Sequence, residues 1–175
     1  MSAPWYTNID SLRADGFGGF CTFQELGDCR LECVPADTGG IGVYVVVRPD
    51  ARAPGFLSQS TGSALTRRGD PSVPVEELAA KWVDGAQVIY IGKAGSLQNP
   101  RETLAERIRQ FVDFGAGEPV DHWDGRYVWQ LAAAEDLVVC WKETPNEEPA
   151  DVAGRMIEEF KEACGGRLPF ANLSE

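Results

Sequence analysis

The sequence predicts an α+β fold in which a small sheet is flanked by helices, within a single domain spanning residues 1–175. Two apolar runs rich in β-branched residues, 41–48 and 87–93, are typical of buried strands. Apolar residues recur at helical spacing in 75–83, 102–114 and 149–164, which is typical of amphipathic helices. A chain of this length buries roughly two-thirds of its unfolded surface in one core, so a second large domain is not expected.

The first half of the chain predicts one strand between two irregular segments. Residues 1–40 mix glycines with polar turn residues and predict an N-terminal cap with little regular structure. The strand at 41–48 is apolar throughout, which favours a central position in the sheet, and Pro49-Asp50 ends it. Residues 49–85 then form a long insertion before the second strand, and only its end, the helix at 75–83, shows periodicity.

The second half predicts two longer helices and two more strands. Leu104, Ile108 and Phe111 share one face of the helix at 102–114. The runs 126–131 and 136–142 are β-branched and aromatic, and they are read as strands separated by an alanine-rich turn. Gly165-Gly166 ends the last helix, at 149–164.

The charge balance disfavours several classes of partner. The chain has 16 Lys+Arg against 27 Asp+Glu, a formal net charge of −11, so its average field repels phosphate and acidic lipid headgroups. The acidity is uneven: residues 85–110 carry four basic against two acidic residues, whereas residues 135–175 carry four against ten. A local basic groove is therefore expected to bind DNA with modest affinity and only where shape adds to charge.

The termini and cysteines indicate the cellular setting. No window reaches the roughly 20 consecutive apolar residues of a membrane span, and the N-terminus lacks a basic segment followed by an apolar run, so a cytoplasmic location and no membrane partner are expected. Five cysteines in a chain of this size favour free thiols. A zinc site of Cys21, Cys29, Cys33 and His122 is disfavoured because the paired two-residue spacing of zinc knuckles is missing.

Two strand motifs and a helical arginine point to a known family. Gly42-Val43-Tyr44 lies in the first predicted strand, Tyr90-Ile91-Gly92-Lys93 in the second, and Arg107 in the helix that follows. Together with the runs 122–131 and 168–172, these motifs resemble the GIY-YIG nuclease superfamily, in particular a bacterial GIY-YIG-like single-domain subgroup, over nearly the whole chain. The resemblance implies a mainly antiparallel sheet.

The resemblance also implies a site for phosphodiester hydrolysis. In the superfamily a motif tyrosine is thought to act as general base, an arginine and a lysine hold the scissile phosphate, and one divalent cation on a glutamate stabilises the leaving oxygen. Carried over, the catalytic candidates are Tyr44, Tyr90, Arg107 and His122, and the phosphate- or DNA-binding candidates are Lys93, Arg109 and Asn172. The cofactor would be Mg²⁺ or Mn²⁺. Sequence does not rank the two tyrosines as base.

Two departures from the family pattern affect the expected chemistry. Phe111 stands where relatives often have His or Tyr. Ala153 stands at the position expected for the metal-ligating glutamate, and alanine cannot bind a hard cation. Three interpretations stay open: the chain is a natural pseudo-nuclease, residue 153 has been changed to trap a substrate complex, or Glu148 or Asp151 supplies the ligand after a register shift. A shift of two residues on a helix turns a side chain by about 200°, so Asp151 would point away from the site.

Three functional hypotheses follow. The first is a metal-dependent DNA endonuclease, present here in a form that Ala153 inactivates. The second is a non-catalytic nucleic-acid-binding or protein-interaction module on the same fold. The third and weakest is a pocket that has abandoned nucleic acid for a small electrophile or phosphate ester. Cleavage by an Ala153→Glu variant would favour the first, metal-independent binding the second, and failure to bind any nucleic acid the third.

Overall fold

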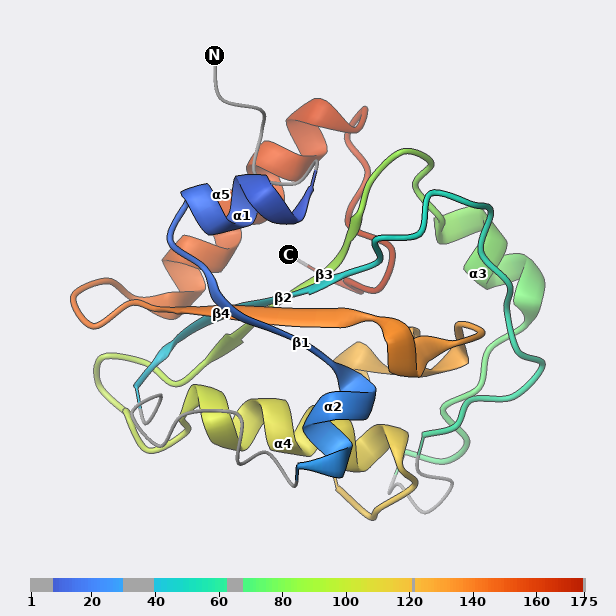
Figure 1. Cartoon of the computed structure of the whole chain (residues 1–175), viewed down its shortest axis with the longest axis horizontal. Helices are drawn as coiled ribbons and strands as arrows, with labels where there is room; N and C mark the ends of the chain where they lie inside the picture. Colours follow the sequence, from blue (N-terminus) through green and yellow to red (C-terminus); the bar gives the residue numbers. More distant parts are fainter. Residues whose placement is uncertain (1–7, 30–39, 63–67, 121, 175) are drawn as a thin grey trace.

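Four antiparallel strands form one sheet in the computed structural model, which describes residues 8–29, 40–62, 68–120 and 122–174 (Figure 1). The strands are β1 (Gly18–Thr22), β2 (Gly42–Val47), β3 (Val88–Ala94) and β4 (Val138–Glu143), and their order across the sheet is β1-β4-β2-β3. The two strands that carry the sequence motifs, β2 and β3, are therefore direct neighbours. The predicted α+β class is confirmed, and so is the central position of the first motif strand.

The composition of β2 explains its central place. All six of its residues are buried, because successive side chains point to opposite faces and both faces are covered. Val43 and Val45 belong to the core on one side of the sheet, whereas Tyr44 and Val46 belong to the core on the other. A strand buried on both faces needs apolar residues at every position, and this run provides them.

Helices cover both faces of the sheet (Figure 1). On one side, α1 (Ile9–Ala14) and α5 (Pro149–Ala163) contribute Leu12 and Phe160 to the core. On the other side, α2 (Phe23–Asp28) and α4 (Leu104–Gly115) contribute Leu26 and Ile108. The insertion contains α3 (Val75–Lys81). The three helices predicted from periodicity are thus confirmed, with ends that differ by one or two residues.

A capping box fixes where α4 begins. The Thr103 hydroxyl accepts a hydrogen bond from the Glu106 N–H at 3.2 Å, and the Glu106 carboxylate accepts one from the Thr103 N–H at 3.2 Å. Arg107 follows directly, next to the buried Ile108. The start of the helix therefore places this arginine at the border of the buried face.

Two predictions of secondary structure are wrong. The N-terminal cap is more regular than expected, because α1, β1 and α2 all lie within residues 1–40 and β1 is a strand of the sheet that pairs with β4. The run 126–131 is not a strand: it contains the 3₁₀ helix η3 (Val128–Gln130), and further short-range bonds include Trp129 N–H donating to Arg126 O and Leu131 N–H donating to Val128 O.

The error at 126–131 has a physical reason. Its apolar side chains pack on the α4 side of the sheet, and the Trp129 indole N–H donates to the Phe111 carbonyl at 3.1 Å. β4 already lies between β1 and β2, and only Leu131 makes a strand-like bridge, with Phe56. An apolar, β-branched run shows that a segment is buried but does not show which backbone partners remain for it.

The C-terminal segment covers the outer edge of β3. Ala171 N–H donates to the Ile89 carbonyl at 2.8 Å. The Asn172 side chain completes the pairing, because its Oδ1 accepts from the Ile91 N–H and its Nδ2 donates to the Ile91 carbonyl, both at 2.9 Å. A buried amide thus takes the place of a neighbouring strand.

The cysteines match the expectation of free thiols only in part. Cys21, Cys140 and Cys164 carry free thiols, but Cys29 is disulfide-bonded, so the expectation of free thiols is wrong there. Cys33 lies outside the described residues. Within the described ranges, no helix combines the length and the apolar character needed to cross a membrane.

Replacing Asn172 tests the edge contact. Asn172→Ala leaves the buried N–H and carbonyl of Ile91 without partners, so we expect a loss of about 3 kcal/mol in the free energy of unfolding, measured by urea denaturation. Asn146→Ala, at an exposed position, serves as the matched control and should change the stability by less than about 0.5 kcal/mol. Equal stability of the two variants would contradict the structural role of Asn172.

Candidate functional site

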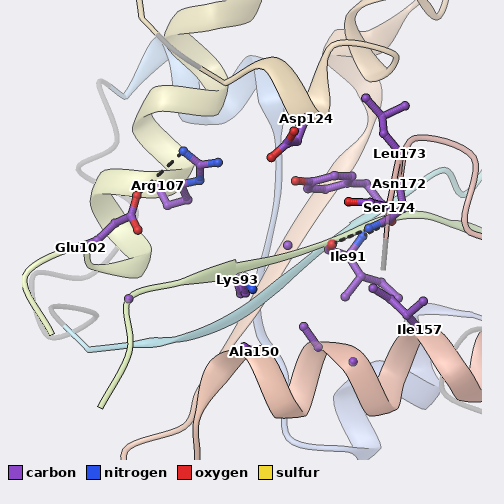
Figure 2. A pocket seen from close by; sticks show the side chains of 15 residues that line it. Ile91, Lys93, Glu102, Arg107, Asp124, Ala150, Ile157, Asn172, Leu173 and Ser174 are labelled. Carbon is purple, nitrogen blue, oxygen red and sulfur yellow. Dashed lines mark hydrogen bonds and ion pairs between the residues drawn. The ribbon is translucent and has the colours of Figure 1, made fainter. Parts of the chain in front are cut away.

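A pocket of about 550 Å³ lies at the outer edge of β3, with walls from α4 and α5 (Figure 2). The 3₁₀ helix η2 (Trp123–Gly125) and the C-terminal segment complete the walls. Residues far apart in sequence meet here, among them the candidates Tyr90, Lys93, Arg107 and Asn172, together with Ala153 at the expected ligand position.

The strand register explains both motif glycines. Tyr44 lies opposite Gly92, and a Cβ at Gly92 would collide with the Tyr44 ring and come within 2.6 Å of its hydroxyl oxygen. A Cβ at Gly42 would collide with the Lys142 carbonyl of the neighbouring strand. These glycines therefore let the Tyr44 ring lie across β3 and let β4 approach β2 closely.

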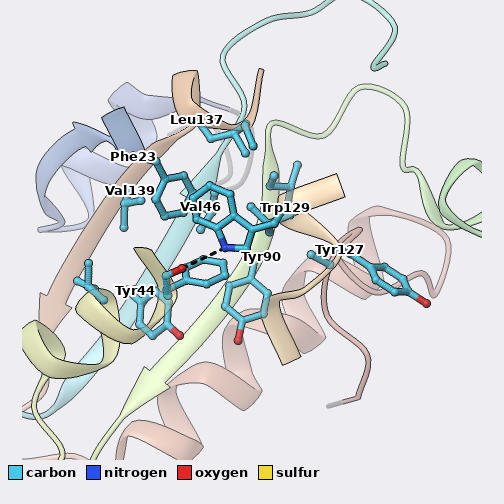
Figure 3. Close-up of a cluster of buried hydrophobic side chains, with 14 of the residues drawn as sticks. Phe23, Tyr44, Val46, Tyr90, Tyr127, Trp129, Leu137 and Val139 are labelled. Carbon is cyan, nitrogen blue, oxygen red and sulfur yellow. Dashed lines mark hydrogen bonds between the residues drawn. The ribbon is translucent and has the colours of Figure 1, made fainter. Parts of the chain in front are cut away.

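The two motif tyrosines differ in their access to the pocket. Their ring centroids are 5.9 Å apart, and both hydroxyls are directed to the same side of the buried cluster (Figure 3). Tyr90 lines the pocket, whereas Tyr44 is fully buried behind it. Only Tyr90 is therefore placed to touch a ligand in the pocket.

His122 is joined to Tyr44 deep in the protein. Its Nε2 lies 3.0 Å from the Tyr44 hydroxyl oxygen, and its ring stacks on Phe111 with a centroid distance of 4.2 Å. The Nδ1 atom is buried without a hydrogen-bond partner among the described residues. His122 thus brings an imidazole beside Phe111, which stands where the family that the sequence resembles often has His or Tyr.

Burial shifts the pKa values of Tyr44, Tyr90 and His122 further from pH 7. Burial raises the pKa of Tyr44, although the Arg107 cation and hydrogen bonds with Tyr90 and Arg107 oppose the rise. The pKa of Tyr90 is raised well above its usual value, first by burial and then by the neighbouring Tyr44. Burial, followed by the Arg107 charge, lowers the pKa of His122 to about 3. All three groups are therefore neutral at pH 7.

Arg107 and Lys93 supply positive charge to the pocket. The Arg107 side chain is 20% exposed, its Nη1 donates to the Gln110 side chain at 3.0 Å, and its ion pair with Glu102 is long, at 3.9 Å. Lys93 is the one exposed residue of β3. Both cations can therefore meet an anion that enters the pocket.

The other predicted binding residues differ from these two. Arg109 is exposed on α4 but does not line the pocket, so the structure does not bring it to the same place. Asn172 lines the pocket, yet both ends of its amide are bonded to Ile91. Its contribution here is to hold the pocket wall along β3.

Two carboxylates in the pocket were missed by sequence reasoning. Glu102 lies just before α4, and Asp124 lies in η2 and is directed toward the pocket (Figure 2). Asp124 is two residues from His122, within the run 122–131 that the resemblance uses, so the sequence offered a signal that it lies near the site. The direction of the Asp124 side chain does not follow from the sequence, because the sequence does not show that residues 123–125 form a 3₁₀ helix.

The donor set does not fit the Mg²⁺ or Mn²⁺ that the resemblance implies. Ala153 faces the pocket from α5 with a methyl group, which offers no oxygen ligand. Glu148 accepts from the Leu97 N–H at 3.1 Å and Asp151 is exposed, and neither lines the pocket. Across the described part of the chain, no three His, Cys, Asp or Glu side chains gather as a metal site, and Cys33 of the disfavoured zinc set lies outside it.

Searches of family models, of curated proteins and of solved structures find no match to this chain.

Burial of His122 predicts a pH-dependent stability. The unfolded chain binds a proton at its ordinary pKa of 6.5, whereas the folded chain resists protonation down to about 3. The stability is complete above pH 6.5 and is lost as the pH falls through this window, by about 1.4 kcal/mol per pH unit. Urea denaturation between about pH 6 and about pH 5, above most carboxylate titrations, measures this slope.

The matched variant is His122→Gln, which keeps a hydrogen-bonding group beside Tyr44 but cannot titrate. It should be less stable than the original chain at pH 7 and should lose most of the slope between about pH 6 and about pH 5. An unchanged slope in this variant would show that another group is responsible.

Proposed function

We propose that this chain is a GIY-YIG-like domain that binds phosphodiester groups of DNA in the β3-edge pocket and does not hydrolyse them in its present form. One observation carries the proposal: Tyr90, Lys93 and Arg107 line a single pocket, with Tyr44 directly behind it. These four residues come from three motifs, on two adjacent strands and a helix, and the fold brings them together.

The two cations suit a phosphodiester. The Arg107 guanidinium presents several N–H donors in a planar fork that matches two phosphate oxygens, and Lys93 adds a point charge from β3. Glu102 and Asp124 in the same pocket offset part of this charge. We therefore expect binding that is modest in affinity and falls with salt, as the net charge of −11 also implies.

The same geometry disfavours hydrolysis. An effective general base has a pKa near the working pH, but burial raises the pKa values of Tyr44 and Tyr90 and lowers that of His122 to about 3. Position 153 offers no ligand for a cation that could stabilise a leaving oxygen. The described part of the chain thus contains groups that would hold a phosphate but no group poised to activate water against it.

A binding measurement tests the first half of the proposal. Arg107→Ala should weaken the binding of fluorescein-labelled DNA at low salt at least tenfold, about 1.4 kcal/mol, measured by fluorescence anisotropy. Chelating divalent cations should leave the affinity of the original chain unchanged. Arg155→Ala, which removes an exposed arginine paired with Glu147, is the charge-matched control and should bind normally. No DNA binding at low salt would refute the proposal.

A gain-of-function variant tests the second half. Ala153→Glu places a carboxylate on the pocket wall, so we expect it to nick supercoiled plasmid or structured DNA in the presence of Mg²⁺ or Mn²⁺. Adding Arg107→Ala to that variant should reduce the rate about 100-fold, because the transition-state charge loses its donor. Strong cleavage by the original chain would contradict its assignment as a binding form.

A further inference from the structure

Beside the pocket, Arg68, Trp123 and Arg126 form a cluster that we call the Trp123 platform. It lies close to the pocket, because Asp124 follows Trp123 in η2, lines the pocket and faces Arg126. None of its three residues has a role in the site described above.

The contacts within the platform are between cations and aromatic rings. The Arg126 guanidinium carbon lies 4.5 Å from the centroid of the Trp123 ring and 5.2 Å from that of Tyr127, and its Nη1 donates to the Trp123 carbonyl at 3.2 Å. The Arg68 guanidinium carbon lies 5.9 Å from the Trp123 ring centroid. A ring holds the flat face of a guanidinium and leaves N–H groups at its edge for an anion.

Arg126 lacks a close carboxylate in the part of the chain that the structure describes. Asp124 and Glu77 face it, but neither forms an ion pair with it. Glu77 instead accepts a hydrogen bond from the Tyr127 hydroxyl at 2.5 Å. Partial burial lowers the pKa of Arg126 from its high ordinary value. A partly buried cation without a carboxylate is costly, and an external anion would offset that cost.

Arg13 provides a contrast within the same chain. Its guanidinium carbon also lies 4.5 Å from an aromatic centroid, that of Phe20, but the guanidinium is paired with Asp10 at 3.4 Å. It lies on α1, whose buried side chains pack on the α5 side of the sheet. Stacking on a ring is therefore common to both arginines, whereas the missing carboxylate and the position beside the pocket belong to Arg126.

We propose that the Trp123 platform binds the nucleotide next to the one whose phosphate enters the pocket, and that the preferred ligand is single-stranded or locally unpaired DNA. The inference rests on the proposed function. Aromatic and guanidinium planes bind bases only where the bases are unstacked, and arginine edges bind the adjoining phosphate. A duplex keeps its bases stacked and would gain only the phosphate contact.

Two probes separate the platform from the pocket. The first is thymidine 5′-monophosphate, which is small enough to occupy the pocket alone, with binding followed by isothermal titration calorimetry. The second is a fluorescein-labelled oligothymidine of about 12 nucleotides, within the usual range for single-strand sites, followed by anisotropy. Arg107→Ala should weaken both, whereas Arg126→Ala should weaken only the oligonucleotide, about five- to tenfold, and reduce the salt slope by about 0.7.

Matched variants keep the result interpretable. Arg13→Ala removes the same charge and the same kind of stacking contact and should leave both affinities unchanged. Arg126→Lys keeps the charge, so the salt slope should recover while part of the affinity stays lost. Thermal melting of each variant checks that it is folded.

The outcomes for the platform and for the pocket are distinct. If Arg126→Ala binds the oligonucleotide as tightly as the original chain, or if a duplex of equal length binds more tightly than the single strand, the platform inference is overturned. If the original chain binds neither probe, or if Arg107→Ala has no effect, the proposed function itself fails.

Discussion

The site depends on the register of β2 against β3, which places Tyr44 opposite Gly92. Because side chains alternate between faces, a slip of one residue would move Tyr44 to the α5 side and bring a valine in its place. Gly92 is equally necessary, because a side chain at that position would occupy the volume of the Tyr44 ring. The contact with His122 and the nearness of Arg107 both follow from this placement.

The pocket exists because β3 is the last strand of the sheet and its neighbours leave room beside it. The Asn172 side chain hydrogen-bonds the N–H and the carbonyl of Ile91 at this edge of β3, so no further strand has to pair with them. Small residues of α5, Ala153 and Gly154, face the space that remains. The small side chain of Ala153, at the position where the resemblance implies a metal ligand, thus leaves the pocket open. Under the proposed function, an open pocket with neutral phenols would hold a phosphate but would have little means to activate water.

In the proposed binding of DNA, the negative net charge of the chain opposes the attraction of the few cations in and beside the pocket. An acidic protein gains little from long-range attraction to DNA, so binding depends on short-range contacts at a few cations. Under the proposed function, Arg107 and Lys93 in the pocket, which share it with Glu102 and Asp124, and Arg126 beside it, which has no ion pair among the described residues, would be such cations. Shape, in the form of unpaired nucleotides that can reach both pocket and platform, would then decide which DNA is bound.

The sequence by itself determined the two motif strands and the three main helices, because local periodicity sets these, whereas it brought Tyr90, Lys93 and Arg107 together only through the family resemblance. The resemblance implied that position 153 faces the site, and helical rotation then indicated that Asp151 points away from it. The sequence did not determine the 3₁₀ turns at 126–131, the sheet strand within residues 1–40, or the pairing of Asn172 with Ile91. The tertiary structure decided those, because a backbone group takes whichever partner the folded neighbours leave available. It also decided the buried Tyr44–His122 contact and the entry of Asp124 into the pocket, since both depend on how distant segments pack.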